Sequence, residues 1–406
     1  MAEKHRSILS LPIALAWAAL LSTFAPALPL DEAWKSFEEK AEKAFVEGRL
    51  NESEELWRAA LGAAEKKSQQ GPDVATVLNQ MTHLFLRQHR YQEAQAALSR
   101  ALQIREKSLG KDNLLTLETM GNLALVKHKL GEDKEALNLY RQCVAAKKKT
   151  EPKSPSTAIT LTNLANLYSE MYRYPEAAKL YSEALQIDTD ALGSGHPEVA
   201  RDLFNLGALN FKCSHFEEAI QHLKQAEKAY QALNDRSGQA NALHYLGLCH
   251  AKLKDPAKAA EHYKEALRLK EETTGMEHPE AIVHKLSLAT ALDESGKNDE
   301  AEELYLKTLS NIKSAKQPHH LRLTECEVDI AHFYRRHGQK EKAEAHFKNA
   351  LNSYELLSRH EKRKLYELPR AYASLLHELK RDSEGDAIAK KYLHVYSPER
   401  NEHMKF

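Results

Sequence analysis

The residues that could do chemistry in this 406-residue chain are a Ser-Gly-Lys segment and a group of histidines. Ser295-Gly296-Lys297 resembles the end of a phosphate-binding loop, but that loop needs glycine five positions before Gly296, where Ala291 stands. Gly296 fits better as a residue that ends a helix. Five histidines crowd one part of the chain, namely His215, His222, His244, His250 and His262. They fall on different faces of predicted helices, so we expect no zinc site.

Signatures of common enzyme classes are missing. The sequence contains no His-Glu-x-x-His motif, no Gly-x-Ser-x-Gly elbow and no dinucleotide-binding fingerprint. Its carboxylates mostly stand beside Lys or Arg, as on the solvated faces of helices. We therefore expect no catalytic residues, no cofactor, no metal and no enzyme activity.

A repeat organises almost the whole chain. A small residue opens each predicted second helix, at Ser53, Ala94, Ala136, Ala177, Ala219, Ala259, Ala301, Ala343 and Gly385, with gaps of 40 to 42 residues. A second small residue stands twelve positions before each, in the predicted first helix, at Ala41, Thr82, Ala124, Ala165, Gly207, Gly247, Ala289, Ala331 and Ala373. Fixed-period self-similarity of this kind is typical of stacked helix hairpins.

One repeat carries the pattern most clearly, through Asn163-Leu164-Ala165, Tyr168, Tyr174-Pro175-Glu176-Ala177, Tyr181, Ala184-Leu185 and Gly193-x-x-His196-Pro197. These residues resemble the tetratricopeptide repeat, in the form of about 42 residues seen in kinesin light chains and many bacterial relatives. The resemblance covers about Trp34 to Glu399. It implies an all-α, right-handed superhelical solenoid of about nine helix-turn-helix repeats, with atypical end repeats acting as caps.

The expected organisation follows from this period. Residues 1–30 are a leader or anchor, residues 31–399 are the solenoid, and residues 400–406 are a tail. The expected repeats are 34–74, 75–116, 117–157, 158–199, 200–239, 240–281, 282–323, 324–365 and 366–399.

The four cysteines do not settle the compartment. Cys143, Cys213, Cys249 and Cys326 show no pairwise spacing and fall in predicted helices. Cys143 takes the place of a packing alanine, so it is interpreted as a small core residue. Cys213 and Cys249 fall late in neighbouring first helices, which leaves a disulfide between them open; the separation of their Cα atoms would decide it.

The resemblance also implies a binding groove on the first helices. Ligand-binding members of the family use positions two before and one, four and five after the small first-helix residue. Carried over, these positions give a candidate partner-binding groove of Asn122, Lys129, Asn163, Asn166, Asn205, Phe211, Lys212, Tyr245, Leu248, Lys252, His332 and Arg336.

Two features of this set suggest a ligand. Asn122, Asn163 and Asn205 recur at one position, and asparagine can both donate to and accept from an extended peptide backbone. The alternative is that they bond locally within the repeats. A second column contains cations, including Lys129, Lys212, Lys252 and Arg336, which would favour an acidic partner. The alternative is that these cations interact with the ends of their own helices.

Composition limits the other partners. Lys and Arg total 58, equal to Asp and Glu at 58, so no basic field for nucleic acid is expected. The N-terminal segment has Lys4 and Arg6, an apolar run from Ile8, and Ala25-Pro26-Ala27. This order is typical of a signal peptide cleaved after Ala27, and of an exported periplasmic or extracellular protein. The alternatives are an uncleaved membrane anchor at residues 8–30 and a cytoplasmic protein with an apolar end.

Our hypothesis is a non-enzymatic scaffold that binds a peptide or protein segment in its concave groove. Two alternatives stay open: a structural or self-assembling component of an envelope complex, and an accessory subunit that regulates an enzyme in trans. The sequence leaves the oligomeric state and the identity of the partner open.

Overall fold

The computed structural model describes residues 33–275, 278–315 and 319–392. Within these ranges every regular element is a helix, which confirms the predicted all-α class. The helices are α1 (Ala33–Val46), α2 (Leu50–Lys67), α3 (Pro72–Arg87), α4 (Tyr91–Leu109), α5 (Leu114–Lys129), α6 (Asp133–Thr150), α7 (Pro155–Glu170), α8 (Tyr174–Leu192), α9 (Pro197–Lys212), α10 (Phe216–Ala232), α11 (Arg236–Lys252), α12 (Pro256–Thr274), α13 (Pro279–Glu294), α14 (Asn298–Ser314), α15 (His320–Arg336), α16 (Lys340–Glu355), α17 (Arg359–Lys364), α18 (Leu368–Glu378) and α19 (Asp382–Lys391).

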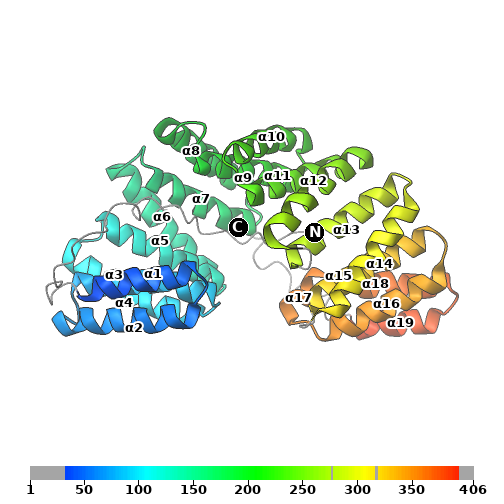
Figure 1. The fold of residues 1–406 in the computed structure, drawn as a ribbon, viewed down its shortest axis with the longest axis horizontal. Helices are drawn as coiled ribbons and strands as arrows, with labels where there is room; N and C mark the ends of the chain where they lie inside the picture. Colours follow the sequence, from blue (N-terminus) through cyan, green and yellow to red (C-terminus); the bar gives the residue numbers. More distant parts are fainter. Residues whose placement is uncertain (1–32, 276–277, 316–318, 393–406) are drawn as a thin grey trace. The chain divides into compact units, whose positions relative to one another are not determined.

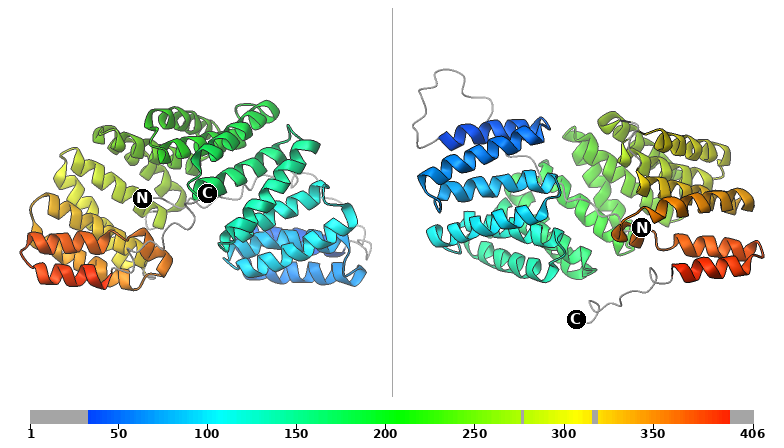
Figure 2. Two further views of the ribbon diagram at one scale, coloured as in Figure 1. Left: turned by 180° about the vertical axis from the view of Figure 1, so that it is seen from behind. Right: turned by 90° about the horizontal axis from the view of Figure 1, so that it is seen from below.

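The described helices pack into two compact units, 33–202 and 203–392, with the boundary inside α9. In each unit, consecutive helices lie side by side as antiparallel hairpins, for example α3 with α4 and α11 with α12 (Figures 1 and 2). No described helix is long and apolar enough to cross a membrane. The predicted leader or anchor at residues 1–30 lies outside the described residues.

Small residues let the two helices of each hairpin approach closely. In the first-helix column, Gly207 faces Leu223 and Gly247 faces Tyr263, both from the second helix of the same repeat. In the second-helix column the residue at each repeat is buried, and Ser53, which stands where most other repeats have alanine, donates from Oγ to Ala41 O at 2.8 Å. The columns that define the repeat in the sequence are therefore the contact lines inside the hairpins.

Each hairpin turns through one left-handed residue. Gly296 has φ +84°, which confirms that it ends the first helix of its repeat. Glycine occupies the equivalent position at Gly48, Gly131 and Gly338, and non-glycine residues occupy it elsewhere, including Tyr172 at φ 60°. Glycine adopts this backbone conformation without steric cost, whereas a residue with a Cβ atom adopts it at a steric cost. The turn geometry is thus kept even where the sequence does not favour it.

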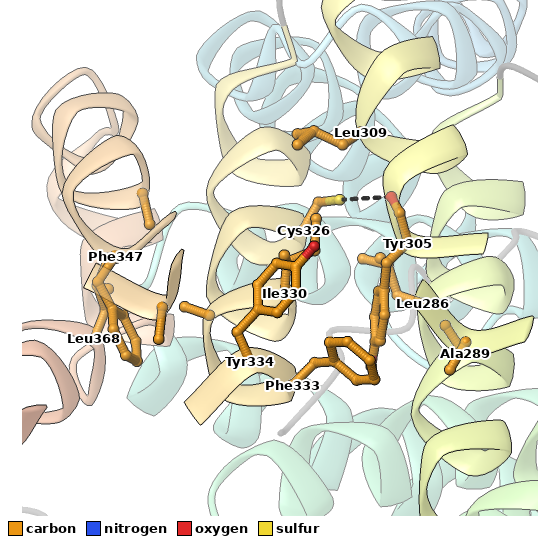
Figure 3. Close-up of a cluster of buried hydrophobic side chains, with 14 of the residues drawn as sticks. Leu286, Ala289, Tyr305, Leu309, Cys326, Ile330, Phe333, Tyr334, Phe347 and Leu368 are labelled. Atoms are coloured by element: carbon orange, nitrogen blue, oxygen red, sulfur yellow. Dashed lines mark hydrogen bonds between the residues drawn. The ribbon is translucent and has the colours of Figure 1, made fainter. Parts of the chain in front are cut away.

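The interior of the C-terminal unit is continuous from hairpin to hairpin. Figure 3 shows Ile330, Phe333 and Tyr334 of α15 beside Tyr305 of α14, and Cys326 Sγ lies 4.0 Å from Tyr305 O. These side chains are buried, and Phe333 and Tyr305 pack with ring centroids 5.7 Å apart. Each hairpin therefore buries its apolar face against the next one, as a stacked repeat requires.

All four cysteines are free thiols. Cys143, Cys249 and Cys326 lie in helices and are buried, so Cys143 is a core residue as predicted. The prediction for Cys213 was wrong, because α9 ends at Lys212 and Cys213 lies in the turn that follows. Cys249 of α11 packs in the core and is not joined to Cys213.

The C-terminal unit also buries two histidines against each other. The rings of His244 in α11 and His284 in α13 lie 4.6 Å apart between centroids, and both side chains are buried. Burial, together with His244 and Lys270, lowers the pKa of His284 to about 3, although its bond to Glu280 O opposes this. His284 is therefore neutral in the folded protein at physiological pH.

Gly247→Ala should destabilise the protein. An added Cβ would lie 2.5 Å from the Tyr263 ring, so we expect the free energy of unfolding to fall by about 1–3 kcal/mol through overpacking. The matched control is Gly121→Ala in α5, where an added Cβ meets nothing within 4 Å and should stabilise the helix by about 0.5–1 kcal/mol. Urea unfolding of both variants makes the measurement. Equal effects of the two changes would contradict close packing at Gly247.

Acid should weaken the C-terminal unit through His284. Its folded pKa lies below the unfolded value, so its contribution to stability is present above about pH 6.5 and is lost as pH falls toward the folded pKa. Between about pH 7 and about pH 5 we expect a loss of about 2 kcal/mol from this group. His284→Phe should lessen the acid sensitivity of urea unfolding, and His215→Phe, at an exposed histidine, is the control. Unchanged acid sensitivity in His284→Phe would overturn the assignment.

Candidate binding face of the first helices

The predicted groove positions lie on the first helices of the hairpins, which are α5 and α7 in one unit and α9, α11 and α15 in the other. We call these surfaces the first-helix face of each unit. Asn122 and Asn163 lie on this face in residues 33–202, and Asn205 lies on it in residues 203–392. All three side chains are half-buried, so each still has contact with solvent.

The asparagines are not equivalent. Asn122 Nδ2 donates to Oδ1 of Asn79, a buried residue of α3, at 3.2 Å. Asn166 accepts a hydrogen bond from the hydroxyl of Tyr181 in the second helix of its own repeat. Asn163 and Asn205 make no side-chain hydrogen bond to any residue that the structure describes. Local bonding therefore accounts for Asn122 and Asn166, while Asn163 and Asn205 keep their amides available.

Contacts between successive first helices follow one rule. We number positions from the small residue of each first helix, so that the +4 residue stands four positions after it and the +5 residue stands five positions after it. The +4 residue of one first helix contacts the +5 residue of the next first helix. Four junctions obey it: Phe45 with Arg87, His128 with Glu170, Asp293 with Arg336, and Arg335 with Glu378. We call these the tied junctions.

The tied junctions combine several kinds of polar contact. Arg87 Nη1 donates to Phe45 O at 3.0 Å, and its guanidinium lies 5.0 Å from the Phe45 ring centroid. Arg335 Nε donates to Glu378 at 3.1 Å. Asp293, which is buried, accepts from both Arg336 and His337, the latter at 2.6 Å. These bonds fix neighbouring repeats to each other.

At the α5–α7 junction the tie is charged. His128 lies 2.8 Å from Asp133 and 3.0 Å from Glu170. Burial of the ring lowers its pKa, but these two carboxylates outweigh burial and raise the pKa of His128 to about 9. His128 is therefore an imidazolium at neutral pH and forms a charge-assisted link to Glu170 of the next repeat.

The cation column consequently has two roles. Arg336 is bound to Asp293 and helps to hold the stack. Lys252 is exposed, Lys129 is half-buried, and neither has an ion-pair partner among the described residues. Lys212 is half-buried at the end of α9. Lys129 and Lys252 therefore remain as cations that could contact an acidic partner, whereas the charge of Arg336 is already paired with Asp293.

Three further junctions lack such a tie within the part of the chain that the structure describes, and we call them the open junctions. Their +4 and +5 residues are Leu86 and Lys129, Phe211 and Lys252, and Ala251 and Glu294. The +4 side chain is apolar in each, and the charged +5 residue makes no contact with it like that of Arg87 with Phe45 O among the described residues. An open junction thus places an apolar side chain beside a charge that the neighbouring first helix does not pair.

The aromatic residues of the α9–α11 junction form one group. Tyr245 is only 3% exposed, and its ring lies 5.4 Å from Phe204 and 5.7 Å from Phe211 between centroids. Tyr245 therefore supports this surface from below instead of forming it. Phe211 and Leu248 are half-buried and are the apolar side chains that reach the face.

His332 lies at the other end of the C-terminal unit. Its half-buried ring meets Phe347 edge-on at 5.2 Å between centroids. Burial and the nearby cations Arg335 and Arg336 lower the pKa of His332. A neutral ring packed on Phe347 contributes to the hairpin and offers a partner little charge.

The sequence did not lead us to Asn79, and it did not lead us to the pairing of +4 and +5 residues at the tied junctions. A signal for the pairs was present, because complementary side chains recur 42 or 43 residues apart, as in His128 with Glu170 and Asp293 with Arg336. Among the crowded histidines, His250 and His262 stack at 5.3 Å between ring centroids. The described residues contain no group of three or more His, Cys, Asp or Glu arranged to hold a metal ion.

Comparison with known proteins agrees with this architecture. The Tetratricopeptide repeat family model matches residues 73–149, 156–232, 211–272 and 238–314, more than half of the chain. Protein KINESIN LIGHT CHAIN-RELATED 2 of Arabidopsis thaliana is 22% identical over 236 residues, 57% of this chain and 35% of that protein. Protein KINESIN LIGHT CHAIN-RELATED 3 of the same plant is 26% identical over 298 residues, 72% of this chain and 46% of that protein.

Both relatives are longer, and this chain spans less than half of each. Among solved structures, a Rap protein complexed with competence and sporulation factor shares the fold, with a TM-score of 0.56 and 17% identity over 90% of this chain and 98% of that one. The repeat period, the paired helices and the family match lead to the same conclusion. The chain belongs to the tetratricopeptide repeat family and is similar to its kinesin light chain-related members.

Proposed function

We propose that this protein is a non-enzymatic scaffold that binds a segment of another protein on its first-helix face. The observation that carries the proposal is the α9–α11 junction, where Phe211 and Leu248 reach the surface beside the exposed Lys252, which has no ion-pair partner among the described residues. Apolar anchors surrounded by polar groups are typical of the residues that dominate binding energy at protein interfaces.

The fold supports this reading. Tetratricopeptide arrays serve mainly as scaffolds for protein–protein interaction, and the solved Rap protein of the same fold was complexed with competence and sporulation factor. The tied junctions support it too, because they leave only particular positions of the face open. Those positions are the ones that a partner can use without breaking the stack.

The open side chains indicate the chemistry of the partner. In residues 203–392, Asn205 can donate to and accept from the backbone of an extended segment. Lys252 would attract carboxylates, and Phe211 and Leu248 would accept an apolar side chain. The segment we propose for this unit is therefore extended, with acidic and apolar residues. In residues 33–202, Asn163 and Lys129 offer the same polar groups on a separate first-helix face.

We also propose that the protein is exported. The support is the order of Lys4 and Arg6, the apolar run and Ala25-Pro26-Ala27 in the sequence. Mass spectrometry of the chain from its host should show a mature N-terminus after Ala27, in a fraction outside the cytoplasm. A full-length chain retained in membranes would favour the anchor, and one in the cytosol would refute export.

Photo-crosslinking at Lys252 tests the proposed face. A benzophenone amino acid at Lys252 should capture a partner protein in the native host, because this position faces an open junction. The control is the same amino acid at Lys264, an exposed lysine on the second helix of the same repeat. Equal capture at both positions, or capture at Lys264 alone, would move binding away from the first-helix face.

Asn205, which lies in the same unit as Lys252, provides a quantitative test with the captured partner. Asn205→Ala should weaken binding about 2- to 12-fold, since it removes hydrogen bonds worth about 0.5–1.5 kcal/mol. Helicity and the unfolding midpoint should stay close to wild type, because this side chain bonds to no described residue. Calorimetric titration that shows wild-type affinity would exclude this amide from the interface.

A further inference from the structure

Three repeats place a buried cation near the end of the second helix, eleven positions after its small residue. Arg105 and Lys147 occupy this position in residues 33–202, and Lys270 occupies it in residues 203–392. We call this the end column. All three cations are at most 4% exposed, so each must find acceptors inside the protein.

Each cation of the end column finds such acceptors. Arg105 Nη1 donates to Leu115 O at 2.8 Å and to Thr119 Oγ1 at 2.7 Å, in the first helix of the next repeat. Lys147 Nζ donates to the carbonyl and hydroxyl of Ser156 at 3.0 and 2.6 Å. Lys270 forms an ion pair with Glu280 at 2.7 Å. The end column therefore joins one repeat to the next.

The fourth repeat reverses the charge of this column. Asp188 of α8 stands where the neighbouring repeats have Arg105 and Lys147, and it is fully buried. Thr119, which accepts from Arg105, stands fourteen positions after that arginine. The residue fourteen positions after Asp188 is Asp202 of α9, which is also fully buried. Two carboxyl groups thus meet at a junction that a cation bridges elsewhere.

These carboxyl groups have few donors among the described residues. Neither oxygen of Asp188 has a hydrogen-bond partner there, and the same holds for Oδ2 of Asp202. The other oxygen of Asp202 accepts from Thr162 Oγ1 of α7 at 3.2 Å. A buried carboxylate left without donors is strongly unfavourable, so full ionisation of both groups is disfavoured.

The surrounding charges do not compensate. Arg201 forms an ion pair with Glu198, which is itself buried, and its charge also acts on Asp188 and Asp202. His196 lies just before α9, and its Nδ1 accepts from the Glu198 backbone N–H at 3.2 Å. Burial raises the pKa of Asp202 to about 8, with Arg201 opposing and Asp188 adding to the shift. Burial also raises the pKa of Asp188. The contact with Asp202 lowers this pKa, and the nearby charge of Glu198 raises it further.

We propose that Asp188 and Asp202 hold one proton between them at neutral pH, and that release of this proton loosens the packing of α8 against residues 197–202 at the start of α9. While the proton is bound, one carboxyl O–H donates to the carboxylate of the other residue. When it leaves for bulk water, two adjacent carboxylates remain without a bridging donor and repel each other. The shared proton takes the place of the cation used by other repeats.

The direction of the pH effect follows from these groups. In the unfolded chain both carboxyls ionise near pH 4, whereas the folded pair keeps a proton to higher pH. Stability from the pair is therefore fully present at low pH and is lost as pH rises through the folded value. This dependence is opposite in sign to that of His284 in the other unit.

Hydrogen exchange of the full chain, followed by mass spectrometry between about pH 5 and about pH 9, tests the proposal. After correction for intrinsic exchange rates, protection in peptides of α8 and α9 should fall about tenfold or more as pH rises. Peptides of α3 and α4, which contain no such pair, should change little. Uniform protection of α8 and α9 across this range would overturn the proposal.

Three variants locate the effect. Asp188→Asn removes one carboxyl and supplies an N–H donor for Asp202, so the pH dependence of protection should weaken, although burial still raises the pKa of Asp202. Asp188→Lys restores the cation of the end column, so the pH dependence should be lost and protection should be higher above about pH 7. Asp190→Asn, at an exposed carboxylate of the same helix, is the control and should keep the wild-type profile. If Asp188→Asn fails to fold, the wild-type and Asp188→Lys profiles decide; a wild-type pH dependence that persists in Asp188→Lys would refute the shared proton.

Discussion

Close approach of two helices at a small residue is the constraint on which the structure depends. At Gly247 the backbone of α11 leaves room for the ring of Tyr263 and for nothing more. The same contact, with alanine, threonine or glycine, recurs in every hairpin and sets its geometry. A hairpin this thin exposes an apolar face, which is covered only by the next hairpin. The regular contact inside one repeat therefore makes stacking between repeats necessary.

Stacking and binding compete for the same side chains. The +4 and +5 residues of the first helices are suited to contact a partner, yet at four junctions they contact each other. A bond such as that of Arg336 with Asp293 stabilises the stack and removes both groups from recognition. The binding face that we propose is thus what remains after the stack has been held together, and it is smaller and less cationic than the column of lysines and arginines indicates.

The sequence was sufficient to predict the repeated part of the structure. The small residues, the helix hairpins and the turn at Gly296 recur with one period, so each repeat confirms the others. Features specific to single repeats were harder to predict. Tyr245 stands in a column of polar residues, but two neighbouring phenylalanines enclose its ring. Asn122 looks identical to Asn163, but only Asn122 has Asn79 within reach. Such differences depend on contacts between repeats, which a pattern within one repeat cannot contain.

The tied junctions also limit how such an array can grow. Tandem duplication adds repeats only if each copy accepts its own image as a neighbour. A second copy of repeat 282–323 would place Asp293 of one copy opposite Glu294 of the other, in place of Arg336. A second copy of the following repeat would set Arg335 against Arg336. Both insertions would bring like charges together, so the order of these two repeats is constrained, while a repeat with an apolar +4 residue could be copied without such repulsion.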